Sequence, residues 1–365
     1  GYGPLIGFLS GWASFAIGFG AGIAASAMSF AAYALRAASL SEDNVLLAKG
    51  LALLLVWCVT AVHSAGTGSG GLLQRLLTTT KVLAILTVIL GGLILGRGNW
   101  SNLTICAPEI NPGLGHMFLG LIFVLYTYLG WNVVGYIAGE IENPQRNIPR
   151  IVIGGTGTVA VIYMLLNVVY LYALPVTALA QEPVLPVAEK AAAALWGPIT
   201  AHLVAVLLCI SIAGGMSSMV WAGPRVYWAM AVDGVFPSFF KAASFSTGVP
   251  VRAILLQSVW ASLLILTGTF EQLVIFSGFV LAAFNSLSIG AVIILRRRHP
   301  ELARPYRVPF YPVLPGLAII VLLMVVGYSL VERPIESVVG IATILSGIPF
   351  YFLWRESSLQ NQPDY

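Results

Sequence analysis

The sequence predicts an all-α protein, a polytopic membrane helix bundle with about ten transmembrane helices. Hydrophobic residues make up 58% of the 365 residues and charged residues only 9%, with a mean hydropathy of +0.91. Soluble domains carry about 25% charged residues, so the composition excludes an ordinary soluble protein. The apolar residues also fall in blocks of roughly 20, the length at which a helix crosses about 30 Å of hydrocarbon.

The blocks are expected to be helices because every backbone N–H and C=O must be paired internally within lipid. The strands of a membrane barrel would be about half as long and would alternate polar with apolar residues, which these blocks do not do. No linker or low-complexity segment divides the chain. Residues 1–365 are therefore expected to form a single transmembrane domain.

Ten apolar segments can be followed in order. The first is rich in Gly and Ala, the long polar connection 173–200 separates the fifth from the sixth, and a short helix is expected within it at 186–196. The predicted spans cover residues 5–33, 45–62, 76–95, 117–138, 151–171, 202–222, 251–266, 273–295, 314–330 and 335–354.

Charge placement predicts the orientation. Thirteen of the 18 Lys and Arg residues fall on the side that holds the connections after the second, fourth, sixth and eighth spans and the C-terminus. Lys and Arg concentrate on the cytoplasmic side, so this side, with the C-terminus, is expected in the cytoplasm of a cell whose plasma membrane holds the chain. The net charge of +4 then reflects topology and implies no nucleic-acid partner. The opposite side holds Arg36, Lys49, Arg97, Lys190 and Arg333.

Three motifs lie beside these spans in a fixed order. They are GEIENPQRNIPR at 139–150, PRVYWAMAVDGVFP at 224–237 and RRRHPELARPYRVPFYPVLP at 296–315. Together they resemble the amino acid–polyamine–organocation superfamily of transporters, and within it the bacterial relatives of the L-type amino-acid transporters. The resemblance runs from the first residues to about Trp354.

The resemblance implies an inverted repeat of two five-helix units, with the substrate between two broken helices. A stretch like YGPLIGFLSGW, here at 2–12, opens the third of twelve family helices. The ten spans would then correspond to family helices three to twelve, so the chain is expected to be truncated at its N-terminus. Only the second broken helix, segment 117–138, would be present.

By this resemblance, the fourth span carries the substrate site. Gly130 would open the helix, since Gly permits backbone geometry that other residues avoid. Tyr126, Thr127 and Leu129 would offer backbone atoms to the substrate amine, with Tyr126 also at the place of an aromatic gate. Trp131 and Asn132 would line the pocket. Alternatively, Gly130 only allows close helix packing, with the aromatic residues in the core or facing lipid.

Lys81 lies near the cytoplasmic end of the third span, where a charge is costly and usually has a function or a partner. By resemblance it acts as a built-in cation, where sodium-coupled members of the fold bind their ion, partnered by Ser217 and Ser218. Transport is then expected to be sodium-independent. Alternatively, Lys81 snorkels to cytoplasmic water.

Two further places could line the pocket. By family position, Phe15, Gly18 and Phe19 in the first span would wall the substrate side chain, although small residues there also favour close helix approach. Phe276, Ser277 and Gly278 form a similar but weaker candidate in the eighth span.

Other patterns predict no further chemistry. GTGSGG at 66–71 matches a dinucleotide-binding pattern but follows no strand, so we expect a flexible loop. No two of the four histidines share a helix face, so no metal site is expected. No catalytic constellation and no cofactor site is evident, which predicts that the chain is not an enzyme. The segment 36–44 lacks the Cys with which animal L-type transporters bond an accessory glycoprotein, so no disulfide-linked partner is expected.

The predicted function is a secondary active transporter, a permease that moves amino acids by exchange or proton-coupled symport. The substrates are expected to be neutral because the visible pocket carries no acidic residue. The alternative is a transporter-derived protein that does not transport, either a sensor or a truncated remnant.

Overall fold

The computed structural model describes residues 1–41, 44–104, 114–128, 130–136, 138, 141–181, 187–242, 248–304 and 306–360. It does not place the side chains of 67, 114–116, 118, 119, 122, 126 and 355–360. Within these ranges every regular element is a helix, as the all-α prediction requires.

In the described part of the chain, eight helices are long and apolar enough to cross a membrane, which makes the chain an integral multi-pass membrane protein. The other two predicted spans differ in form. The seventh is α11 (Val251–Thr267), a helix of 17 residues, and the fourth is divided into α5 (Leu114–Thr127) and α6 (Val133–Tyr136). The eight long helices cover Pro4–Ala37, Val45–Ala65, Gly68–Leu95, Pro144–Ala173, Pro198–Val232, Phe270–Arg298, Val313–Glu332 and Pro334–Trp354.

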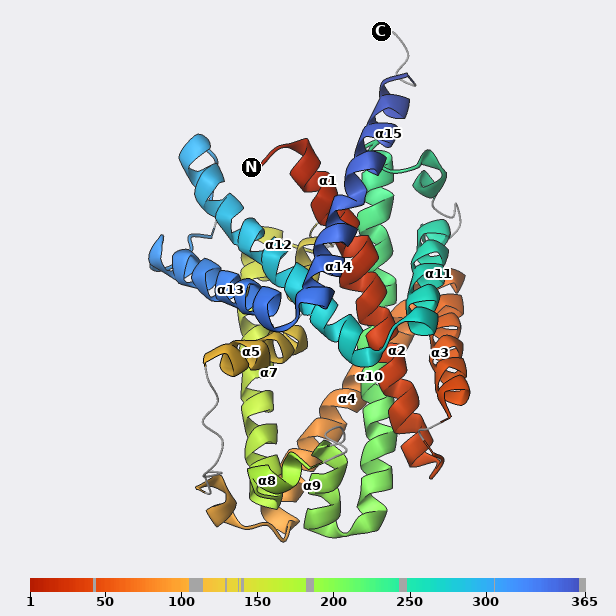
Figure 1. The fold of residues 1–365 in the computed structure, drawn as a ribbon, viewed down its shortest axis with the longest axis vertical. Helices are drawn as coiled ribbons and strands as arrows, with labels where there is room; N and C mark the ends of the chain where they lie inside the picture. The colour runs from red at the N-terminus through yellow and green to blue at the C-terminus, as the bar shows by residue number, and fades with distance from the viewer. Residues whose placement is uncertain are drawn as a thin grey trace.

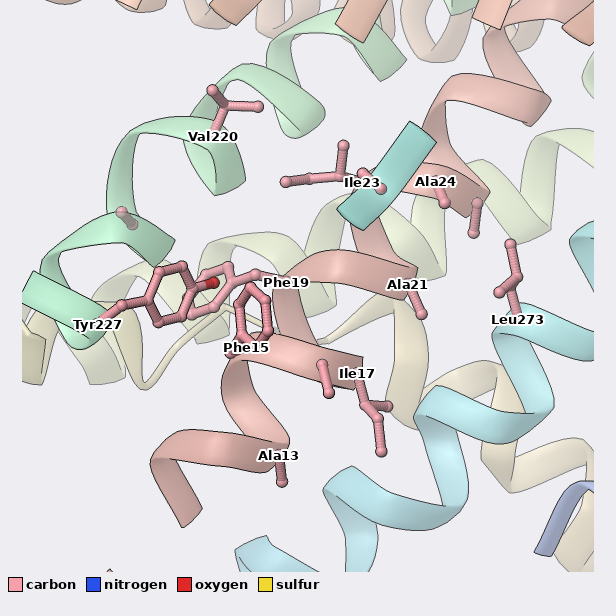
Figure 2. Packing of buried hydrophobic residues seen from close by; sticks show 14 of the residues in the cluster. Ala13, Phe15, Ile17, Phe19, Ala21, Ile23, Ala24, Val220, Tyr227 and Leu273 are labelled. Atoms are coloured by element: carbon pink, nitrogen blue, oxygen red, sulfur yellow. The ribbon is translucent and has the colours of Figure 1, made fainter. Parts of the chain in front are cut away.

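The first span lies at the centre of the bundle. It runs from α1 (Pro4–Ala13) through a π-helical turn, η1 (Ser14–Phe19), into α2 (Gly20–Ala37). The small residues of α2 are buried and let it pack closely on α10 (Pro198–Val232), the longest helix described (Figure 1). Figure 2 shows side chains of the first span, among them Phe15 and Phe19, packed beside Tyr227 of α10.

The second and third spans join almost without a loop. α3 (Val45–Ala65) and α4 (Thr67–Leu95) are separated by Gly66, whose φ of 153° is open to glycine and strained for other residues. The expectation of a flexible loop at 66–71 is therefore wrong, because residues 67–71 form the first turn of α4. A further Cβ at Gly70 would lie 2.5 Å from His63 Nδ1, which shows how closely the two helices approach there.

One end of the bundle is closed by short helices. η2 (Trp100–Leu103), α8 (Val176–Leu179) and α9 (Val187–Trp196) lie at the end opposite the N-terminus and α15 (Figure 1). The short helix expected at 186–196 is thus confirmed as α9. A small apolar cluster there joins α9 to α4 and to α7 (Pro144–Ala173).

The last third of the chain packs around the first span. After η4 (Ser238–Lys241) and α11 come α12 (Phe270–Arg298), α13 (Val313–Glu332), α14 (Pro334–Leu345) and α15 (Gly347–Gln360). Thr269 and Gln272 form a capping box that starts α12. Trp12 of α1 donates its indole N–H to the Thr343 carbonyl at 3.0 Å and stacks on Phe350, which ties the C-terminal helices to α1.

Candidate functional site

The fourth span is interrupted at the point where the sequence predicted an opening. α5 ends at Thr127, α6 begins at Val133, and Gly130 between them has a φ of +105°. A side chain at this backbone angle would be strained, so glycine is what permits the interruption. The ends of the two half-helices leave carbonyl and N–H groups outside the helical pattern, available to other partners.

A tyrosine of α7 already uses one of these groups. The hydroxyl of Tyr163 donates to the Thr127 carbonyl at 3.1 Å, and the Tyr163 ring meets the Tyr128 ring edge-on at 5.4 Å between centroids. The Thr127 hydroxyl donates back to the Val124 carbonyl at 2.7 Å. A carbonyl oxygen has two lone pairs, so Thr127 can accept a second donor, such as an ammonium group. Leu129 and the side chain of Tyr126 lie outside the described part of the chain.

Beyond the break, the side chains of Trp131 and Asn132 have different neighbours. Asn132 donates from Nδ2 to the Tyr136 hydroxyl at 3.0 Å, and the Tyr136 ring lies 6.2 Å from the Phe19 ring. Trp131 instead faces a hollow of about 390 Å³ against α12 and α13, where it lies beside Asn285. Asn132 is therefore brought toward the first span through Tyr136 and Phe19.

Phe15, Gly18 and Phe19 lie on or beside the π-helical turn. Phe15 packs edge-on against Tyr227 at 5.0 Å, and both phenylalanines are 7% exposed. A Cβ added at Gly18 would lie 3.5 Å from Leu281, which lines a small cavity of about 50 Å³ together with Trp131. Phe19 and Gly18 are thus linked to the broken span through Tyr136 and Leu281, whereas Phe15 packs on α10.

The π-helical turn itself was not predicted. Its wider winding accompanies a hydrogen bond from Trp260 Nε1 to the Ala16 carbonyl at 2.8 Å. Single π-turns inside α-helices are frequent at functional sites. The sequence gives no local signal for this one, because the bond comes from α11, 244 residues further along.

The three weaker pocket candidates in α12 lie in different surroundings. Ser277 is fully buried and donates to the Leu273 carbonyl of its own helix at 2.6 Å, and Gly278 faces the small cavity beside Trp131. Phe276 lines a cavity of about 860 Å³ between the first span, α11, α12 and α14. Of the predicted pocket residues in the first span, only Phe15 lines that cavity.

Lys81 lies at the seam between α4 and α10. Its Nζ lies 3.8 Å from the position that a Cβ at Gly215 would take, one turn beyond the place where Leu77 packs on Gly214. Among the described residues, no hydrogen bond joins Lys81 to Ser217 or Ser218.

Both serines have other partners. Ser217 Oγ lies 2.8 Å from His63 Nε2, and Ser218 accepts a hydrogen bond from Gln74 at 2.6 Å. Gln74 also reaches the Gly214 carbonyl at 3.4 Å. The seam is thus built from polar contacts that the sequence alone did not identify. His63 is 2% exposed and, although near the end of α3, is held inside the bundle.

A further cavity opens beside His63. It measures about 410 Å³ and lies between α6, α10, α11 and the turn that joins α3 to α4. His63 stacks on Trp221 at 6.4 Å with 10° between the ring planes, and the Arg225 guanidinium lies 4.8 Å from the same indole. The cavity also reaches Tyr136, the residue that binds Asn132.

Comparison with known proteins agrees with this architecture. The model of the amino acid permease family matches residues 1–351. The serine/threonine exchanger SteT of Bacillus subtilis is 30% identical over 361 residues, which cover 96% of this chain and 79% of that protein. The b(0,+)-type amino acid transporter 1 of Homo sapiens is 27% identical over 360 residues, covering 97% of this chain and 72% of the relative.

A further human relative, the cystine/glutamate transporter, is 26% identical over 357 residues, with 97% of this chain and 70% of the relative covered. These relatives are transporters rather than enzymes, and they match across almost the entire chain. The broken fourth span, the all-helical membrane bundle and the matched family model converge on one assignment. The chain belongs to the amino acid permease family, within the amino acid–polyamine–organocation superfamily that its motifs resemble.

Proposed function

We propose that this chain is a secondary active transporter that moves amino acids across the cytoplasmic membrane by exchange or proton-coupled symport. The observation that carries the proposal is the interruption of the fourth span at Gly130 in a member of the amino acid permease family. Backbone groups freed at the ends of half-helices are a recurring way to bind small charged substrates near the middle of a membrane. Here the Thr127 carbonyl would accept from the substrate ammonium group.

The proposed substrates are neutral amino acids. Among the described residues, the three cavities that contact the broken span are lined by no Asp or Glu side chain. A cationic substrate side chain would lose its hydration there without gaining a partner, which is costly in a low-dielectric site. Relatives named for serine, threonine and neutral amino acids support the same class.

The proposed coupling does not use sodium. Lys81 is a fixed positive charge on α4, facing the small residues of α10 beside Ser217 and Ser218. A resident ammonium group there would take the place of a coupling cation and repel a second one. Its position against Gly215, well inside a membrane-spanning helix, supports this role over simple snorkelling.

In the proposed orientation, the N-terminus, the α12–α13 connection and the C-terminus face the cytoplasm. The excess of 13 of 18 basic residues on this side supports it. We also propose that no disulfide-linked subunit is needed, since the sequence has no Cys in 36–44. A C-terminal reporter that is active only in the cytoplasm tests the orientation, and activity in a periplasmic reporter would reverse it.

Counterflow into proteoliposomes tests the function. Purified protein is reconstituted into liposomes loaded with unlabelled L-serine, and uptake of external labelled L-serine is followed. Exchange predicts faster uptake into loaded than into empty liposomes. Symport predicts instead that an inward acid gradient drives uptake and that a protonophore abolishes it.

Two controls sharpen the result. Replacing sodium by choline should leave uptake unchanged, and a collapse would contradict the proposed coupling. Liposomes without protein set the background. Uptake at background under both the loaded and the acid-gradient conditions would contradict transport and favour a non-transporting sensor.

A further inference from the structure

The cavity beside His63 lies at the α3–α4 turn, which faces the cytoplasm in the proposed orientation. Its walls come from four elements that are distant in sequence: the α3–α4 turn, α6, α10 and α11. The volume of about 410 Å³ is in the range that accommodates a small ligand. None of the residues predicted from the sequence to form the substrate site lines this cavity.

Its chemistry suits a molecule that has both an anionic and an apolar part. Of the lining residues, Arg225 is always cationic and His63 can become so, and none is acidic. Arg225 Nη1 donates to the Trp221 carbonyl at 2.8 Å, which fixes the guanidinium over the indole. A guanidinium has five N–H donors, so a carboxylate can join the partners that Arg225 has in the protein.

The apolar part of a ligand would meet two indoles. Trp221 and Trp228 are seven residues apart on α10, about two turns, and therefore lie on the same helix face. Trp221 contacts both the His63 ring and the Arg225 guanidinium, and Trp228 donates from Nε1 to the Lys241 carbonyl at 3.1 Å. The two indoles are thus fixed by other contacts before any ligand arrives, which lowers the entropic cost of binding.

The cavity also adjoins the broken span. Tyr136 lines it from α6, accepts a hydrogen bond from Asn132 at 3.0 Å, and packs against Phe19 at 6.2 Å. A chain of direct contacts therefore joins the cavity to residues proposed for the central site.

We propose that this cavity is a second amino-acid site on the cytoplasmic side of the transport path. Arg225 holds the substrate carboxylate there, and Trp221 and Trp228 cover its side chain. The inference rests on the proposed transport of amino acids. The substrate would bind there on its way between the cytoplasm and the proposed site at the interruption of the fourth span.

Fluorine NMR of the full-length protein in lipid nanodiscs tests the site. Its tryptophans are replaced biosynthetically by 5-fluorotryptophan, and the Trp221 and Trp228 signals are assigned from Trp221→Phe and Trp228→Phe variants. The sample is titrated with L-alanine, with L-alaninamide, which lacks the carboxylate, and with potassium chloride. L-Alanine should shift both signals, and the other two should not.

Arg225→Gln should weaken the L-alanine titration by at least about tenfold in Kd, the size expected for loss of a charged hydrogen bond. The Kd of Arg225→Lys for L-alanine should lie between those of the wild type and Arg225→Gln. Lysine keeps the positive charge but lacks the planar guanidinium that binds a carboxylate with two parallel hydrogen bonds. Arg252→Gln is the matched control. Arg252 also bonds a backbone carbonyl, that of Phe239, and lies 4.2 Å over its ring, but it does not line the cavity.

Equal shifts with L-alanine and L-alaninamide, equal shifts with chloride, or an unchanged Kd in Arg225→Gln would each overturn the inference. A single monodisperse peak on size exclusion and unaltered signals from the other tryptophans show that the Arg225 variants are folded. The two proposals fail separately. Absent counterflow in wild-type liposomes overturns the transport function, whereas normal counterflow without an Arg225-dependent shift overturns only the second site.

Discussion

Nε2 of His63 lies 2.8 Å from Oγ of Ser217, so a side chain near the end of α3 is hydrogen-bonded to the middle of α10. His63 is 2% exposed and Ser217 is fully buried. Because no water replaces a lost partner at such a place, breaking this bond leaves an unsatisfied polar group inside the bundle. The link holds the α3–α4 turn against the helix that carries Arg225.

Removing either partner should destabilise the protein. Ser217→Ala and His63→Ala are each expected to lower the free energy of unfolding by about 1–3 kcal/mol. The double variant should lose less than the sum of the two single losses, because the second change removes a group that is already unpaired. Thermal unfolding in detergent measures the stability of the two single variants and of the double variant. His202→Ala, at an exposed position, is the control, and strictly additive losses would show that the two residues do not interact.

Gly130→Ala should impair transport. The φ of +105° at Gly130 is strained for alanine, which costs about 1–3 kcal/mol and favours a closed helix over the interruption. L-Serine counterflow should fall by at least about tenfold if that strain is relieved by closing the break.

Gly135→Ala in α6 is the matched control for this change. A Cβ there meets nothing within 4 Å and the backbone angle is ordinary, so counterflow should stay close to wild type. Equal activity in the two variants would contradict a role for the interruption.

Lys81→Met should impair amino-acid exchange without unfolding the protein. The substitution keeps an unbranched side chain of similar length at the α4–α10 seam and removes the charge. Counterflow should fall by at least about tenfold, the factor that corresponds to about 1.4 kcal/mol. Lys49→Met removes an equal charge from α3, where Lys49 donates to the exposed Leu266 carbonyl at 2.6 Å, and should leave counterflow unchanged.

Gly223→Ala should be among the most destabilising changes in α10. The added methyl group would collide with Gln257 Oε1, which accepts the Tyr227 hydroxyl at 2.6 Å in the buried core. Overpacking of this kind costs about 1–3 kcal/mol. Gly154→Ala in α7 has open space around it and should leave the unfolding temperature unchanged or raise it slightly. Equal unfolding temperatures for the two variants would contradict the close packing at Gly223.

The sequence by itself determined the helices that cross the membrane. Blocks of apolar residues locate the spans because lipid forces the backbone of each block to satisfy its own hydrogen bonds. The interruption at Gly130 was expected from the resemblance to the transporter superfamily, because a glycine inside an apolar span is also compatible with close helix packing. The short helix α9 was also predicted, within the longer polar connection between the fifth and sixth spans.

Only the tertiary structure decided which side chains meet. His63 lies 154 residues from Ser217 and Trp260 lies 244 residues from Ala16, so no local pattern could pair them. The resemblance assigned Ser217 and Ser218 to Lys81, and the packing of α3 and α4 on α10 also brings these serines into hydrogen bonds with His63 and Gln74. Apolar periodicity reports which residues avoid water, but polar contacts between helices depend on their relative rotation and depth, which are fixed when the whole bundle packs.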